Sequence, residues 1–127
     1  ELYRTFAIPY FKQICMQIQQ VPITIFAKDA GFALPDMKAL PCRTIGLDWT
    51  MDPIHSRQTL GEKFTLQGNL DPCVLYADED TITLETKKML HQFGKKNYIC
   101  NLGHGLYPDI DRFKIKHFVE VVKSMHY

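Results

Sequence analysis

Four short apolar runs, separated by longer stretches with helical spacing, constrain the fold of this chain more than any other feature. The runs cover residues 22–27, 44–49, 64–67 and 98–102. Short runs of apolar, β-branched and aromatic residues are typical of strands. Because these runs are nearly continuous rather than alternating, they predict burial on both faces, as in a parallel sheet.

The stretches between the runs carry helix signals. Over residues 2–20, apolar side chains recur at helical spacing and four of them fall on one face: Phe6, Tyr10, Ile14 and Ile18. Further helices are expected over 32–40, 53–60, 79–93 and from 112 onward. The last three are each preceded by an aspartate that can act as N-cap: Asp52, Asp78 and Asp111.

The predicted elements therefore alternate, beginning and ending with a helix. Strands that alternate with helices form right-handed βαβ units and a parallel sheet. An open doubly wound sheet and one half of a (β/α)8 barrel both accommodate four such units. A whole barrel takes about 250 residues, and this chain has 127. No linker divides it, so residues 1–127 are expected to form one partial domain.

Composition excludes several classes of function. A net charge of +1 provides no basic stripe for nucleic acid, and no apolar run approaches the roughly 20 residues that cross a bilayer. The chain shows no signal peptide. It opens with Glu1 rather than Met, so an N-terminal portion is expected to be missing. The scattered cysteines predict reduced thiols in a reducing compartment, the cytosol, rather than disulfides or a zinc site: Cys15, Cys42, Cys73 and Cys100.

Polar residues follow every predicted strand, where ligands bind in α/β folds. They are Lys28 and Asp29; Asp48 and Trp49; Gln67, Asn69 and Asp71; and Asn101 and His104. Most of them also have a structural interpretation. Lys28 can pair with a carboxylate, Asp48 can accept loop N–H groups, residues 67–72 can build a turn, and Trp49 can belong to the core.

His104 is the strongest candidate for a binding residue. It lies between Gly103 and Gly105, which allow a backbone to approach a ligand closely, and its imidazole can donate to a carboxylate. The chain contains no nucleophile elbow, phosphate-binding loop, dinucleotide fingerprint or metal-spaced His/Cys cluster. The residues by themselves therefore indicate one rim of a polar cleft and no particular chemistry.

At the same strand ends the sequence closely resembles the uroporphyrinogen decarboxylase family, especially its eukaryotic form. The matching stretches are residues 25–29 (IFAKD), 45–50 (IGLDWT), 66–73 (LQGNLDPC) and 101–109 (NLGHGLYPD). The last two are long and specific. The resemblance covers nearly the whole chain and implies the C-terminal half of a (β/α)8 TIM barrel, about four βα units.

The resemblance also implies an activity. The family removes the carboxyl groups of four acetate side chains of uroporphyrinogen, giving coproporphyrinogen and CO2 in haem biosynthesis, without a cofactor or a metal. The resemblance also implies a homodimer. The pyrrole serves as its own electron sink, so the protein supplies charge placement and geometry.

One family site residue maps onto this chain. His104 is expected to contact a substrate carboxylate or the macrocycle. The family's catalytic aspartate, tyrosine and serine, and its carboxylate-binding arginines, would precede Glu1, so no catalytic residue is assigned here. A zinc-dependent corrinoid methyltransferase branch uses the same fold, but Lys28 stands where that branch needs a metal ligand.

Three hypotheses remain open. The chain is either part of a decarboxylase or a truncated, non-catalytic product that at most binds the full enzyme; a self-contained α/β binding domain is a third possibility. A half barrel exposes unpaired sheet edges and apolar side chains. We therefore expect this chain alone to be marginally stable, to associate and to lack decarboxylase activity.

Overall fold

Four parallel strands lie side by side in chain order, β1-β2-β3-β4. They are β1 (Thr24–Phe26), β2 (Thr44–Gly46), β3 (Thr65–Leu70) and β4 (Tyr98–Leu102). The computed structural model describes residues 1–125. The predicted parallel α/β architecture is confirmed: the bounds of β4 agree with the prediction, and those of the other three strands differ by up to three residues. β2 is shorter than expected because the chain turns inward at Asp48, whereas β3 extends to Leu70 because it pairs with β4 up to Leu102.

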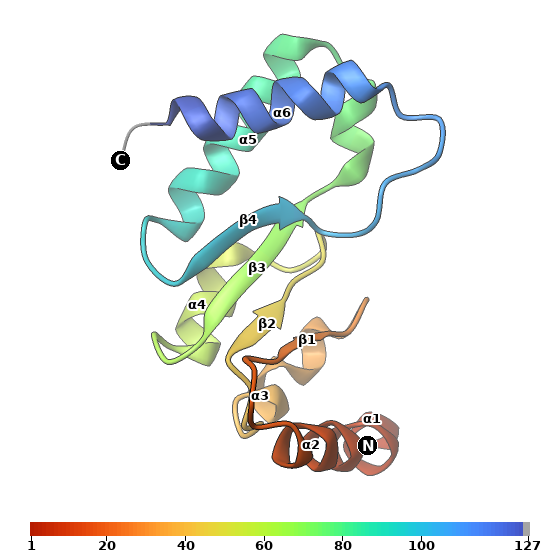
Figure 1. Cartoon of the computed structure of the whole chain (residues 1–127), viewed down its shortest axis with the longest axis vertical. Helices are drawn as coiled ribbons and strands as arrows, with labels where there is room; N and C mark the ends of the chain where they lie inside the picture. Colours follow the sequence, from red (N-terminus) through yellow and green to blue (C-terminus); the bar gives the residue numbers. More distant parts are fainter. Residues whose placement is uncertain (126–127) are drawn as a thin grey trace.

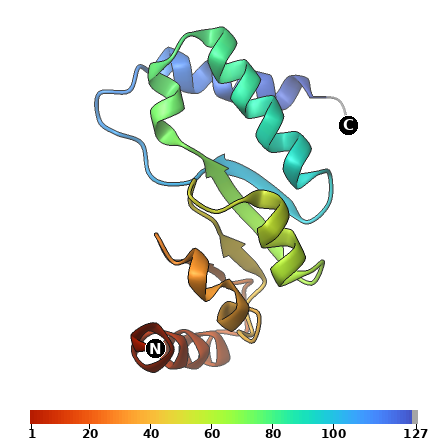
Figure 2. The same cartoon turned by 180° about the vertical axis from the view of Figure 1, so that it is seen from behind.

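Helices connect and flank the strands (Figure 1). They are α1 (Leu2–Phe6), α2 (Ile8–Gln17), α3 (Leu34–Met37), α4 (Pro53–Leu60), α5 (Glu79–Phe93) and α6 (Arg112–Ser124), with 3₁₀ segments η1 (Gly31–Ala33) and η2 (Pro72–Tyr76). Figure 2 shows α3, α4 and α5 in front of one face of the sheet. α6 packs on α5 beyond β4, while α1 and α2 lie past the β1 edge.

The three aspartate caps are confirmed. The carboxylates accept the backbone N–H groups of His55 at 2.6 Å, Thr81 at 2.8 Å and Phe113 at 2.9 Å. Each such cap stabilises its helix by about 1 kcal/mol. Short local signals thus fixed the beginnings of α4, α5 and α6.

The single helix expected over residues 2–20 was wrong. It breaks at Ala7, where φ is −119°, because Pro9 has no N–H to continue the helix across this point. The apolar face predicted for it, here called the α1–α2 stripe (Phe6, Tyr10, Ile14 and Ile18), faces solvent, and Phe6 is 67% exposed. The side of α2 that meets the core instead carries Cys15, which is buried.

One face of the sheet forms the core with the helices. Ile25, Ile45 and Leu66 are partners in register across β1, β2 and β3, and all three are buried. In the same row, Tyr98 of β4 stacks on Phe93 of α5 with ring centroids 4.2 Å apart. Each buried aliphatic side chain stabilises the fold by roughly 2 kcal/mol. This row therefore anchors the helices to the sheet.

The opposite face is open. Phe26 and Ile99 lie on it, 44% and 45% exposed, and Gln67 lies between them in the same row. Burial on both faces, as the continuous runs predicted, holds for β2, all of whose residues are buried. It is wrong for β1 and β4, because the helices that follow the strands pack on the other face. The expectation that a half barrel exposes apolar side chains is confirmed.

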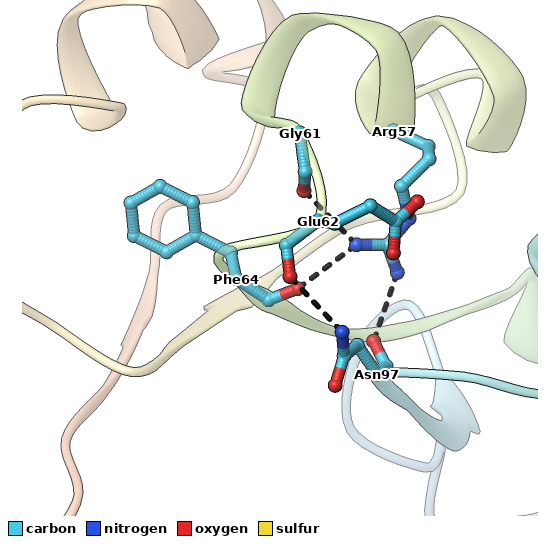
Figure 3. Close-up of polar contacts among 5 residues, drawn as sticks. All are labelled: Arg57, Gly61, Glu62, Phe64 and Asn97. Carbon is cyan, nitrogen blue, oxygen red and sulfur yellow. Dashed lines mark hydrogen bonds and ion pairs between the residues drawn. The ribbon is translucent and has the colours of Figure 1, made fainter.

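Arg57 forms hydrogen bonds with backbone groups at the end of the sheet where β3 and β4 begin (Figure 3). Its guanidinium donates to the carbonyl oxygens of Gly61 at 3.1 Å, Phe64 at 2.9 Å and Asn97 at 2.8 Å. Asn97 in turn donates from its side chain to the carbonyl of Glu62 at 3.0 Å. One side chain from α4 thereby joins the segments that lead into β3 and β4.

Candidate functional site

The rim is the end of the sheet at which the four strands finish, and Asp48 lies at its centre. This carboxylate is fully buried. It accepts the backbone N–H of Asp29 at 2.6 Å and that of Thr50 at 2.8 Å, and it also accepts the Thr50 hydroxyl. The interpretation of Asp48 as an acceptor for loop N–H groups is confirmed. With its oxygens engaged, Asp48 holds the loops after β1 and β2 together and does not face a ligand.

Asn69 and Asp71 also hold the rim in place. The buried Asn69 amide donates to the carbonyl oxygens of Asp48 at 2.9 Å and Met51 at 2.6 Å. Asp71 accepts the backbone N–H of Cys73 at 2.8 Å and so begins η2. The turn interpretation is confirmed for Asp71, while Asn69 connects β3 to the loop after β2.

Three side chains meet above this scaffold and are called the rim cluster: Lys28, Trp49 and His104. The Lys28 ammonium lies 5.4 Å from the centroid of the Trp49 ring. The His104 ring approaches the same indole edge-on, with centroids 6.0 Å apart and planes at 89°. Trp49 is only partly buried, so its assignment to the core was wrong: the chain turns after Asp48 and leaves the indole at the surface between two polar side chains.

His104 is exposed, and its Nδ1 lies 3.3 Å from the carbonyl oxygen of Gly105. The two flanking glycines differ in the space around them. A Cβ on Gly105 would meet nothing within 4 Å, whereas one on Gly103 would lie 2.5 Å from the Trp49 backbone nitrogen. Gly103 therefore serves close packing between strand ends and not the approach of a ligand, which corrects half of the expectation from the sequence.

The loop after β4 is tied to η2. The Tyr76 hydroxyl donates to the carboxylate of Asp109 at 2.6 Å, and this bond, together with desolvation, raises the pKa of Tyr76 to about 12. Ile110 is buried below it. Tyr76 and Asp109 are 33 residues apart, so no local pattern predicted the contact, although Asp109 ends the stretch that resembles the decarboxylase family.

A hollow of about 590 Å³ joins His104 to the open face of the sheet. Phe26, Gln67 and Asn101 line it from the strands, and Ile115 and Phe118 line it from α6. A mostly apolar wall with a few polar groups at its edge is the usual form of a site for an organic ligand. Asn101 and His104, two residues that the sequence placed at strand ends, thus share one hollow.

Metal ligation has no support in the described part of the chain. Within residues 1–125, no group of three or more His, Cys, Asp or Glu side chains is arranged to hold a metal ion. All four cysteines are free thiols. No helix among these residues has the length and apolar character needed to cross a membrane.

Comparison with known proteins decides the family. The family model described as uroporphyrinogen decarboxylase (URO-D) matches residues 1–125. The chain belongs to the uroporphyrinogen decarboxylase family. The human uroporphyrinogen decarboxylase is 44% identical over 131 residues, and that of Chloroherpeton thalassium is 40% identical over 130. Each alignment covers 96% of this chain and 36–37% of the relative, so the chain spans about a third of the length of the family members it matches.

A solved structure supports the fold independently. A methyltransferase from Methanosarcina mazei superimposes with a TM-score of 0.81 at 16% identity, over 95% of this chain and 36% of its own. That neighbour has a TIM-barrel fold. The four βα units of this decarboxylase-family chain therefore have the arrangement of part of a (β/α)8 barrel.

Proposed function

We propose that this chain forms one wall of the active site of a uroporphyrinogen decarboxylase. The reaction would replace four acetate carboxyl groups of uroporphyrinogen by hydrogen, releasing four CO2 molecules and giving coproporphyrinogen. The observation that carries the proposal is the position of His104. It stands at the edge of an apolar hollow, on the rim that binds ligands in barrel enzymes, within a chain of this family.

The chemistry assigns His104 a binding role. Protonation of a pyrrole carbon makes the ring an electron acceptor for the pair released as the C–C bond to the carboxyl carbon breaks. The imidazole can donate a hydrogen bond to a substrate carboxylate from this side of the pocket. Asp48 is fully buried and bonded to loop donors, so it is not available to face a pyrrole N–H.

Other parts of the proposal follow from the family. The residues that stabilise the pyrrole cation would lie outside this chain, in the remainder of a (β/α)8 barrel that places them opposite the rim cluster. The enzyme would act as a cytoplasmic homodimer without a cofactor. The exposed α1–α2 stripe and the open face of the sheet favour a chain that functions only with that remainder.

A chimera tests this function. The matched segment of the human decarboxylase is replaced by this chain, and coproporphyrinogen formation from uroporphyrinogen is measured. We expect turnover by the chimera and none by this chain alone. A chimera that unfolds cooperatively and has the native oligomeric state, yet makes no product, would contradict the proposal.

His104→Asn provides the test of the residue. Loss of one charge-assisted hydrogen bond should weaken the binding of coproporphyrin by about tenfold without changing the thermal unfolding midpoint of the chimera. The matched control is His55→Asn on α4, an exposed histidine remote from the hollow. Equal effects of the two substitutions would show that His104 has no binding role.

A further inference from the structure

We propose that Lys28 is a second carboxylate-binding residue of the site and that it holds a carboxylate that the reaction retains. This inference rests on the proposed decarboxylase function and adds a residue to it. The Lys28 ammonium and the His104 imidazole both lie within 6.0 Å of the centroid of the same indole ring, that of Trp49. The rim therefore presents a cation and a hydrogen-bond donor against the same indole ring.

One side-chain contact and the backbone of the next residue determine where the Lys28 ammonium lies. The face of Trp49 attracts it electrostatically, which favours a side-chain position over the indole. The backbone on the other side is fixed, because Asp29 adopts a left-handed conformation with φ of 57° and donates its N–H to the buried Asp48. Lys28 thus projects from the end of β1 over the indole that His104 also contacts.

Lys28 remains available to a ligand. Its ion pair with the Asp29 carboxylate spans 3.3 Å, and both side chains are substantially exposed, 45% and 65%. Exposed pairs of this kind contribute little to stability, so a carboxylate of the substrate can replace Asp29 at small cost. A polycarboxylate enters with several acidic groups, and a point charge on the rim suits one of them.

The chemistry of decarboxylation decides which carboxylate Lys28 binds. A cation beside a departing carboxylate stabilises the ground state, because the negative charge leaves that group as CO2 forms. Such a contact opposes the reaction, since catalysis requires interactions that strengthen in the transition state. A rim cation therefore fits a propionate, which remains on the product, and not an acetate.

The test uses the folded, active chimera and two stable probes, the oxidised porphyrins uroporphyrin and coproporphyrin. Lys28→Gln should raise the Kd of both probes and the KM for uroporphyrinogen about tenfold with kcat unchanged, and Lys28→Arg should restore most of the affinity. The loss should shrink at high salt. The matched control is Lys63→Gln, because the Lys63 ammonium also lies over an aromatic ring, that of Phe64 at 5.2 Å, but at the opposite end of the sheet.

The outcomes separate the two proposals. If the unsubstituted chimera turns over substrate and binds both probes but Lys28→Gln matches Lys63→Gln, the inference fails and the function stands. A loss of uroporphyrin affinity alone, or a fall in kcat without a rise in KM, would assign Lys28 to an acetate and overturn the retained-carboxylate inference. If the folded, unsubstituted chimera neither binds nor reacts, both proposals fail.

Discussion

Gly103→Ala should be among the most damaging single substitutions at the rim. An added Cβ would lie 2.5 Å from the backbone nitrogen of Trp49, 3.0 Å from the carbonyl carbon of Asp48 and 3.1 Å from the carbonyl oxygen of Asn69. All three are backbone atoms. The segment that contains Asp48 and Trp49 has little freedom to move aside, because the Asp48 carboxylate accepts two loop N–H groups and the Asn69 amide donates to the Asp48 carbonyl.

The magnitude follows from this geometry. Overpacking a well-packed site usually costs about 1–3 kcal/mol, and contact with three fixed backbone atoms places Gly103→Ala at the upper end, about 3 kcal/mol. For a chain of this length that corresponds to a fall of roughly 10 °C in the unfolding midpoint. The free energy of unfolding is measured by urea titration at a fixed protein concentration, with Trp49 fluorescence as the signal.

Gly105→Ala is the matched control, because its Cβ meets nothing within 4 Å. It should change the free energy of unfolding by less than about 0.5 kcal/mol. If both substitutions change stability by the same amount, the close approach of β4 to the end of β2 does not contribute, and the packing argument is wrong.

Three further predictions concern the scaffold. Arg57→Met should lower the free energy of unfolding by about 2–4 kcal/mol, because it removes a charged donor to three carbonyl groups. The control is Arg4→Met, which should lower it by under about 1 kcal/mol because the Arg4 side chain is 69% exposed. Urea unfolding compares the two variants. Burial raises the pKa of Cys42 from 9.0 to about 11, with a smaller contribution from the negative charge of the Cys15 thiolate. The neutral thiol therefore stabilises the fold fully below pH 9, and this stability is lost as the pH rises through 11. In Cys42→Ala, the free energy of unfolding should fall less over this pH range. Urea titrations at a series of pH values measure it. Phe6→Lys should reduce self-association in sedimentation velocity, whereas the equally exposed Leu84→Lys, outside the stripe, should not.

Sequence signals were reliable where the physical cause was local. The aspartate caps predicted the beginnings of α4, α5 and α6, since a carboxylate and the N–H groups it accepts lie within three residues of each other. The alternation of strands and helices predicted the parallel sheet for the same reason. Polar strand ends predicted the rim because parallel strands all finish at one edge.

Non-local contacts were the part that the sequence did not reveal. An amphipathic pattern gives the apolar side of a helix but not the partner that covers it, and within this chain the α1–α2 stripe faces solvent. Trp49 looks like a core residue by type, yet the burial of Asp48 turns the chain and places the indole between Lys28 and His104. The bond from Tyr76 to Asp109 joins residues too far apart for any pattern to detect.

The guanidinium of Arg57 donates only to main-chain carbonyl oxygens at these three positions, and every amino acid has such a carbonyl group. Substitution of the side chains at these positions therefore leaves the three acceptor groups in place. Arg57 thus helps the β3–β4 pairing to align the two strands that lead to Asn69 and His104. A combinatorial library that diversifies residues 104–109 for new ligands should therefore leave Arg57, which lies outside that loop, unchanged.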